Sequence, residues 1–74
     1  MQRVEHWWNQ EWASANREDL YVFVDEKGHV LVQLRAGGKE IEATFADLEH
    51  ARPTIAAQTS VGAWRLFTSA ASSR

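Results

Sequence analysis

The side chains of this 74-residue chain that could carry chemistry are few and scattered. Cysteine is absent, and His6, His29 and His50 each lack a second metal-ligating residue three or four positions further along the chain. A structural or catalytic zinc ion needs about three or four such protein ligands together. We therefore predict no metal, and we interpret the three histidines as solvated surface side chains.

The sequence also contains no motif for a serine nucleophile or for a phosphate-binding loop. No serine stands in a Gly-x-Ser-x-Gly context, and Gly37-Gly38 is interpreted as a turn because no helix follows it directly. Four carboxylates are interpreted as residues of a turn or of a helix start: Asp25, Glu26, Asp47 and Glu49. A chain this short can hardly enclose the cavity of roughly 300–1,000 Å³ that a small-molecule site needs. The sequence predicts a protein that is not an enzyme and that has no cofactor.

Tryptophan is the residue type that most distinguishes the chain. Trp7, Trp8 and Trp12 fall within six residues, and Trp64 lies far along the chain, where it is predicted to join the core. Tryptophan is mostly buried in folded proteins, but clustered exposed aromatic side chains also mark partner-binding sites. The N-terminal cluster is therefore either core or interface, and the sequence leaves both interpretations open.

Composition limits the class of protein further. The chain is long enough for one small domain, and its net charge is −2, whereas general nucleic-acid binders normally carry a basic excess. Its longest apolar run, residues 20–24, is far shorter than the roughly 20 residues that span a bilayer. The first residues lack the apolar region of a secretory signal. We expect a cytoplasmic protein with no membrane partner.

The helices and strands determine where each of these side chains lies. The first of them is predicted to be a helix over residues 2–15. Four residues recur at spacings of four and three, which places them on one helical face: Val4, Trp8, Trp12 and Ala15. An extended start, in which Val4, His6 and Trp8 alternate, is the alternative.

A three-stranded antiparallel meander is predicted next, with strands over 20–24, 29–35 and 40–45. Gly28 closes a three-residue loop in the left-handed conformation, and Gly37-Gly38 forms a two-residue turn of the primed type. The turns impose these pairs: Val24 with Val30, Val22 with Val32, Leu20 with Leu34, Arg35 with Glu40, Leu34 with Ile41, Val32 with Ala43, and Val30 with Phe45. Both turns thereby place apolar residues on one shared face, which supports this register.

A second helix is predicted over residues 46–60, with Thr44 as its cap and Asp47 in its first turn. Pro53 either kinks this helix or opens another short helix as its first residue, and Gly62 ends it.

A short strand is predicted over 63–68. The expected architecture is a single α+β domain over residues 1–68, formed by the N-terminal helix, the three-stranded meander, the kinked second helix and this strand. Residues 69–74 are small and polar, and they are predicted to form a disordered tail.

The reverse face of the meander supplies the candidate partner-binding site. Tyr21 and Phe23 on it need a cover, because a solvent-facing sheet surface normally becomes polar, and the tryptophan helix is the intramolecular candidate for that cover. Trp8 and Trp12 are predicted to be buried there, whereas Trp7 lies off their stripe and is predicted to be exposed. The candidate site comprises three aromatic anchors and an acidic rim: Trp7, Tyr21, Phe23, Glu40 and Glu42.

These observations predict a small protein-binding module that sterically occupies a partner protein. Inhibitors, anti-defence and immunity proteins and accessory subunits act in this way, including those that phages and mobile elements encode. Aromatic side chains would anchor in the partner, and acidic residues would steer the approach to it. Two alternatives stay open: a nucleic-acid-binding domain with a three-stranded sheet, which the missing basic excess disfavours, and a homodimer formed through the tryptophan segment or an open sheet edge.

Overall fold

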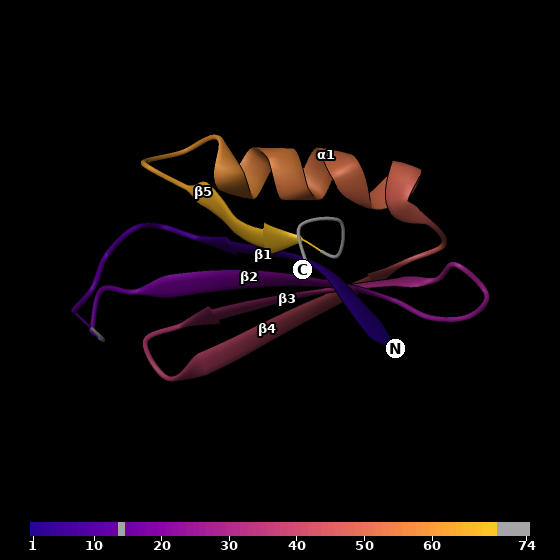
Figure 1. The fold of residues 1–74 in the computed structure, drawn as a ribbon, viewed down its shortest axis with the longest axis horizontal. Helices are drawn as coiled ribbons and strands as arrows, with labels where there is room; N and C mark the ends of the chain where they lie inside the picture. Colours follow the sequence, from indigo (N-terminus) through magenta and orange to yellow (C-terminus); the bar gives the residue numbers. More distant parts are fainter. Residues whose placement is uncertain (14, 70–74) are drawn as a thin grey trace.

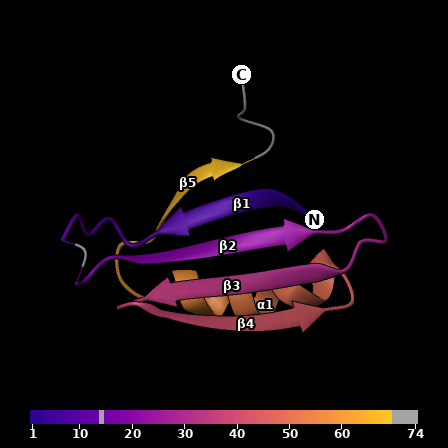
Figure 2. The same ribbon diagram turned by 90° about the horizontal axis from the view of Figure 1, so that it is seen from below.

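The computed structural model describes residues 1–13 and 15–69 and shows a five-stranded antiparallel sheet with one helix on one side (Figure 1). The elements in chain order are β1 (Gln2–Trp8), β2 (Glu18–Val24), β3 (Val30–Ala36), β4 (Lys39–Phe45), α1 (Leu48–Thr59) and β5 (Arg65–Ser69). The spatial order of the strands is β4-β3-β2-β1-β5, so the last strand lies beside the first (Figure 2).

The predicted N-terminal helix is wrong, because the residues assigned to it form β1 and the loop after it. β1 pairs with β2 on one side and with β5 on the other, so both edges of its backbone find hydrogen-bond partners. Valine, histidine and tryptophan are poor helix formers, and valine and tryptophan favour strands. The alternation of Val4, His6 and Trp8 was therefore closer to the real structure than their helical spacing.

A bulge modifies that alternation. The register of β1 against β2 shifts between Arg3 and Glu5, so Val4 is the extra residue. After the bulge, Glu5 pairs with Val22 and His6 pairs with Tyr21. The side chains of Glu5 and Trp7 therefore lie on the helix side of the sheet, and those of His6 and Trp8 lie on the opposite side.

The predicted meander and its register are confirmed in β2, β3 and β4. All seven predicted pairs occur, from Val24 with Val30 at one end to Val30 with Phe45 at the other. The turn glycines adopt the left-handed conformation that the prediction requires, with φ of 89° at Gly28, 58° at Gly37 and 81° at Gly38. The turn geometry therefore fixes the register of this half of the sheet.

Replacement of Gly38 by alanine is expected to destabilise the protein through the backbone alone. No atom lies within 4 Å of the space that a Cβ would occupy there, but its φ of 81° costs a residue with a Cβ about 1–2 kcal/mol. Urea unfolding measures this loss. Lys39→Ala, at the next position, is the control and should leave the midpoint nearly unchanged, and an unaltered midpoint for Gly38→Ala would contradict this account.

The second predicted helix is present as α1, a single helix with Pro53 inside it. Its cap is Asp47 and not Thr44, since the Asp47 carboxylate accepts a hydrogen bond of 2.9 Å from the backbone N–H of His50. Thr44 cannot serve as the cap because it still belongs to β4, where it pairs with Leu31.

The short C-terminal strand is also confirmed, as β5, although its pairing with β1 was not predicted. Ser69, the first residue of the predicted tail, is the last residue of this strand. Residues 70–74 lie outside the described part of the chain.

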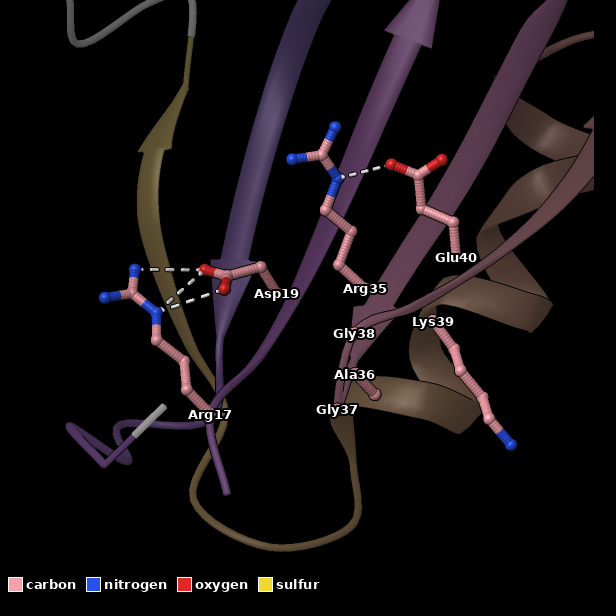
Figure 3. Close-up of a pocket in the computed structure, with 8 residues that line it drawn as sticks. All are labelled: Arg17, Asp19, Arg35, Ala36, Gly37, Gly38, Lys39 and Glu40. Carbon is pink, nitrogen blue, oxygen red and sulfur yellow. Dashed lines mark hydrogen bonds and ion pairs between the residues drawn. The ribbon is translucent and has the colours of Figure 1, made fainter. Parts of the chain in front are cut away.

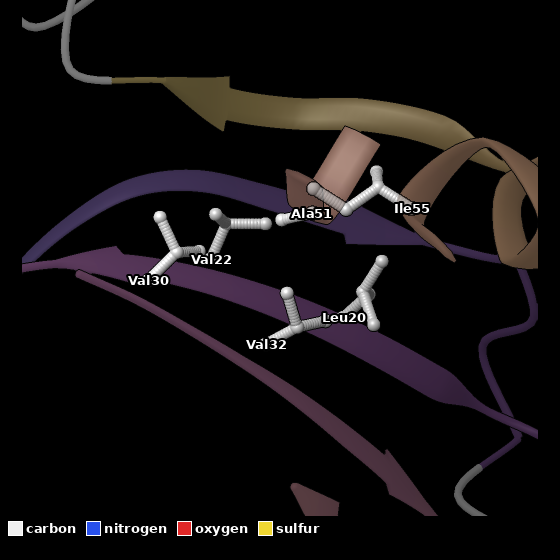
Figure 4. Close-up of a cluster of buried hydrophobic side chains, with 6 residues drawn as sticks. All are labelled: Leu20, Val22, Val30, Val32, Ala51 and Ile55. Atoms are coloured by element: carbon white, nitrogen blue, oxygen red, sulfur yellow. The ribbon is translucent and has the colours of Figure 1, made fainter. Parts of the chain in front are cut away.

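The core lies between the sheet and α1 (Figure 4). Its buried members come from β2, β3 and the helix: Leu20, Val22, Val30, Val32, Ala51 and Ile55. Partly buried apolar side chains complete it, among them Trp7 and Trp64. This hydrophobic cluster thus lies on one face of the sheet.

An ion pair joins the helix to β1. Arg52 Nη1 and Nη2 lie 2.9 and 2.6 Å from the two oxygens of Glu5, and the Trp7 indole donates a hydrogen bond of 3.0 Å to the same carboxylate. Partial burial raises the pKa of Glu5, but the hydrogen bonds from Arg52 and Trp7 outweigh it and lower that pKa below its ordinary value. Glu5 is therefore ionised at neutral pH, and its carboxylate connects α1 to β1.

Candidate functional site

The side of the sheet opposite α1, called the open face below, is the candidate site. In Figure 2 it faces the viewer with α1 behind it, and no described helix or strand covers it. The pairs that point to this side include His6 with Tyr21 and Arg3 with Phe23. The tryptophan segment cannot provide the predicted cover, because it is itself part of the sheet.

Six rings form a continuous row across the open face, called the aromatic row below: Trp12, Trp8, Phe67, His6, Tyr21 and Phe23. In that order, neighbouring ring centroids lie 4.7, 5.7, 5.0, 4.4 and 6.2 Å apart. These separations are close to the range in which aromatic rings attract one another. This attraction adds to the stabilisation that comes from burying their apolar surface. The row is therefore a packed structure that spans β1, β2 and β5.

Exposure differs sharply within the aromatic row. Trp8 and His6 are buried, at 8% and 5% exposed, whereas Trp12 is 78% and Phe67 56% exposed. The predicted burial of Trp8 is confirmed, and the predicted burial of Trp12 is wrong. The prediction that His6 is a solvated side chain is also wrong, because the strand places it between Tyr21 and Phe67.

The loop after β1 is held in a defined conformation that presents Trp12. The Asn9 side chain accepts hydrogen bonds from the backbone N–H groups of Glu18 and Glu11, at 3.0 and 3.3 Å. Gln10 adopts a left-handed φ of 63°, and its side chain donates a hydrogen bond of 2.6 Å to the carbonyl of Ala63. A non-glycine residue in this conformation costs energy and is concentrated at functional sites. The loop therefore positions Trp12 over Trp8 at some cost in stability.

A polar network supports the row from within. His6 Nε2 lies 2.8 Å from Asp19 Oδ1, while Arg17 donates to both oxygens of Asp19, with Nε to Oδ2 at 3.0 Å and Nη2 to Oδ1 at 3.1 Å. Partial burial raises the pKa of Asp19, but the hydrogen bonds from Arg17 and His6 outweigh it and hold that pKa below its ordinary value. The Arg17 guanidinium also lies 5.0 Å from the centre of a Trp8 ring. Asp19 thereby fixes a histidine and an arginine against the aromatic row.

Two further arginines lie against Tyr21, with Arg3 5.7 Å and Arg35 5.4 Å from the ring centre. Arg35 also forms an ion pair with Glu40, in which its Nε lies 2.9 Å from a carboxylate oxygen (Figure 3). An open hollow of about 480 Å³ lies on one side of Arg35, between β2 and the β3–β4 turn, and is lined by Arg17, Asp19, Gly37, Lys39 and Glu40, among others. A smaller hollow of about 190 Å³ lies on the other side, lined by Arg3, Tyr21, Phe23 and Gln33.

The structure brings together four of the five residues predicted for the site. Tyr21, Phe23, Glu40 and Glu42 all lie on the open face, where Glu40 pairs with Arg35 and Glu42 accepts a hydrogen bond of 2.7 Å from Gln33. Trp7 lies on the other face, where it is partly buried against the core. The site residues that the sequence interpretation did not select are Trp12, Phe67 and the arginines. Treating residues 4–8 as a strand would have placed His6 and Trp8 beside Tyr21, but no local pattern indicates Phe67.

Metal-ligating side chains do not gather in the part of the chain that the structure describes. Residues 1–13 and 15–69 contain no group of three His, Asp or Glu side chains placed to hold a metal ion. His29 and His50 are exposed, as predicted, and each contacts a nearby carboxylate, Asp25 at 3.2 Å and Asp47 at 2.7 Å. In the same part of the chain, no helix has the length and apolar character required to traverse a bilayer.

Comparisons of the chain with models of known protein families, with curated proteins and with solved structures gave no match. Its function is therefore inferred from the geometry of the open face.

Proposed function

We propose that this chain is a small protein-binding module that occupies its partner through the open face of the sheet. The aromatic row carries the proposal, because it contains two large exposed rings, Trp12 and Phe67, that are supported by buried Trp8 and His6. Tryptophan, tyrosine and arginine dominate the binding energy of protein interfaces. A ring already held in place also loses less conformational freedom when it binds.

The charges of the open face favour a protein partner over a nucleic acid. Arg17 is paired with Asp19, and Arg35 with Glu40, so part of the positive charge is already compensated. Binding to a phosphate backbone depends on positive charge that releases counterions. Alternating arginines and carboxylates instead resemble the mixed polar surroundings of aromatic anchors at protein interfaces. Trp7 has no part in this proposal, because it lies on the helix side.

The proposal is tested by capture from a lysate of the source cells with the chain immobilised. The double variant Trp12→Ala, Phe67→Ala is expected to lose the captured protein, with affinity falling by about 30-fold or more if each ring contributes about 1–2 kcal/mol. A matched control, Ile41→Ala with Val61→Ala, removes two side chains that are 62% and 72% exposed away from the aromatic row. The control should retain the protein.

Three outcomes would contradict the proposal. The first is equal capture by the wild type and by the double variant at Trp12 and Phe67. The second is retention on single-stranded or double-stranded oligonucleotides that the double variant loses, which would assign the open face to nucleic acid. The third is a dimeric mass by light scattering that the double variant converts to the monomer mass, which would make a second copy of the chain the occupant.

A further inference from the structure

We infer that the partner segment on the open face is extended and acidic, and that Arg35 is the central residue that binds its carboxylates. This inference rests on the proposed function and adds the chemistry of the partner. It follows from the distribution of charge, from the position of Arg35 and from the spacing of side chains along the strands.

The open face is positive although the chain is negative. Four of the eight Lys and Arg residues of the chain lie on it, against three carboxylates, whereas the net charge of the chain is −2. The seven residues are Arg3, Arg17, Arg35, Arg65, Asp19, Glu40 and Glu42. Arg3 and Arg65 form no ion pair with any described residue. Complementary charge therefore favours an acidic segment.

Arg35 occupies the boundary between the two hollows and retains free donors. The ion pair with Glu40 is drawn from its Nε, and in Figure 3 its terminal nitrogens point away from that carboxylate. Its guanidinium lies 5.4 Å from the centre of the Tyr21 ring, and the Arg35 side chain lines both hollows. A guanidinium with two unused N–H groups suits the paired oxygens of a carboxylate.

The spacing of the open face suits an extended segment. Side chains two positions apart in a strand share a face and lie about 7 Å apart. An extended peptide repeats at the same distance, so its carboxylates at alternate positions lie on one side and can reach both Arg35 and Arg3, whose guanidinium groups lie 5.4 and 5.7 Å from the centre of the Tyr21 ring. The side chains between these carboxylates then point away from the sheet. The two hollows provide room on either side of Arg35. A nucleic acid, with a charge at every nucleotide, would also have to approach Asp19, Glu40 and Glu42.

A synthetic peptide, acetyl-Glu-Leu-Glu-Leu-Glu-amide, is the probe, and the lysine peptide acetyl-Lys-Leu-Lys-Leu-Lys-amide is its opposite-charge control. Titration of the full ¹⁵N-labelled chain is monitored through the tryptophan indole and arginine Nε–H signals. Only the glutamate peptide should bind, more weakly as salt rises. Arg35→Gln should weaken its binding by about tenfold, as expected for the loss of one charge-assisted hydrogen-bonded pair. Lys27→Gln removes the same charge from an exposed turn and should change the affinity by less than about twofold.

Arg35→Lys separates charge from geometry. It keeps the positive charge but loses the planar fork, so its affinity for the glutamate peptide should lie between those of the wild type and Arg35→Gln. The inference is overturned if both peptides bind equally, if Arg35→Gln binds like the wild type, or if octathymidylate binds more tightly than the glutamate peptide. Capture of the natural partner distinguishes the two proposals. If Arg35→Gln retains it and the double variant at Trp12 and Phe67 loses it, this inference fails while the proposed function stands.

Discussion

Trp8→Ala is expected to lower the free energy of unfolding by about 3–5 kcal/mol, the usual cost of truncating a buried aromatic side chain. Trp8 is 8% exposed and contacts both exposed rings of the aromatic row, Trp12 and Phe67. Its loss also removes the surface against which the Arg17 guanidinium lies. Urea unfolding followed by far-UV circular dichroism measures the change without depending on the fluorescence of the deleted ring.

Trp12→Ala is the matched control for Trp8→Ala. Trp12 lies four residues away but is 78% exposed, so its truncation should change stability by about 0.5 kcal/mol or less. Stable Trp12→Ala together with weakened partner capture would separate the binding role of Trp12 from the structural role of Trp8. Equal losses of stability in the two variants would contradict the exposure difference between them.

Asp19→Asn is expected to cost about 1–3 kcal/mol of stability at pH 7, because it weakens hydrogen bonds to a charged group at a mostly buried position. The Asp19 side chain is 14% exposed, and its carboxylate contacts both His6 and Arg17. Asparagine keeps the shape but removes the charge, so Arg17 loses its ion pair. Differential scanning calorimetry measures the effect, and Glu26→Gln, in an exposed turn, controls for the change of net charge.

The same carboxylate makes the fold sensitive to acid. The pKa values of Asp19 and Glu5 lie below their ordinary values in the folded protein, so ionisation of both groups favours the folded state. Their contribution is complete above the unfolded pKa values of about 4 and is lost as the pH falls through the lower folded values. The thermal midpoint should therefore vary little, on account of these two groups, from pH 7 to about pH 5 and fall below about pH 4. Asp19→Asn should flatten that acid decline, and an equally steep decline in the variant would contradict the role assigned to Asp19.

The sequence by itself determined the meander and its register. The information is local, since Gly28 and Gly37-Gly38 permit only certain turns and the alternating apolar residues then choose one face. That register also places Tyr21, Phe23, Glu40 and Glu42 together on the reverse face of the meander. These four residues remain in the surface that the proposed function uses.

Only the tertiary structure decided the state of the tryptophan segment and the rest of the site. Val4, Trp8 and Trp12 fit a helical spacing, and the bulge at Val4 obscures the strand alternation. The segment becomes a strand because β2 and β5 supply backbone partners on both sides, including a pairing of Glu5 with Ser69 across most of the chain. The preferences of these residues for helix or strand differ only slightly in free energy. The backbone hydrogen bonds that β1 forms with a strand on each side contribute more. The same long-range pairing brings Phe67 to His6 and Trp8, so the aromatic row exists only in the folded chain.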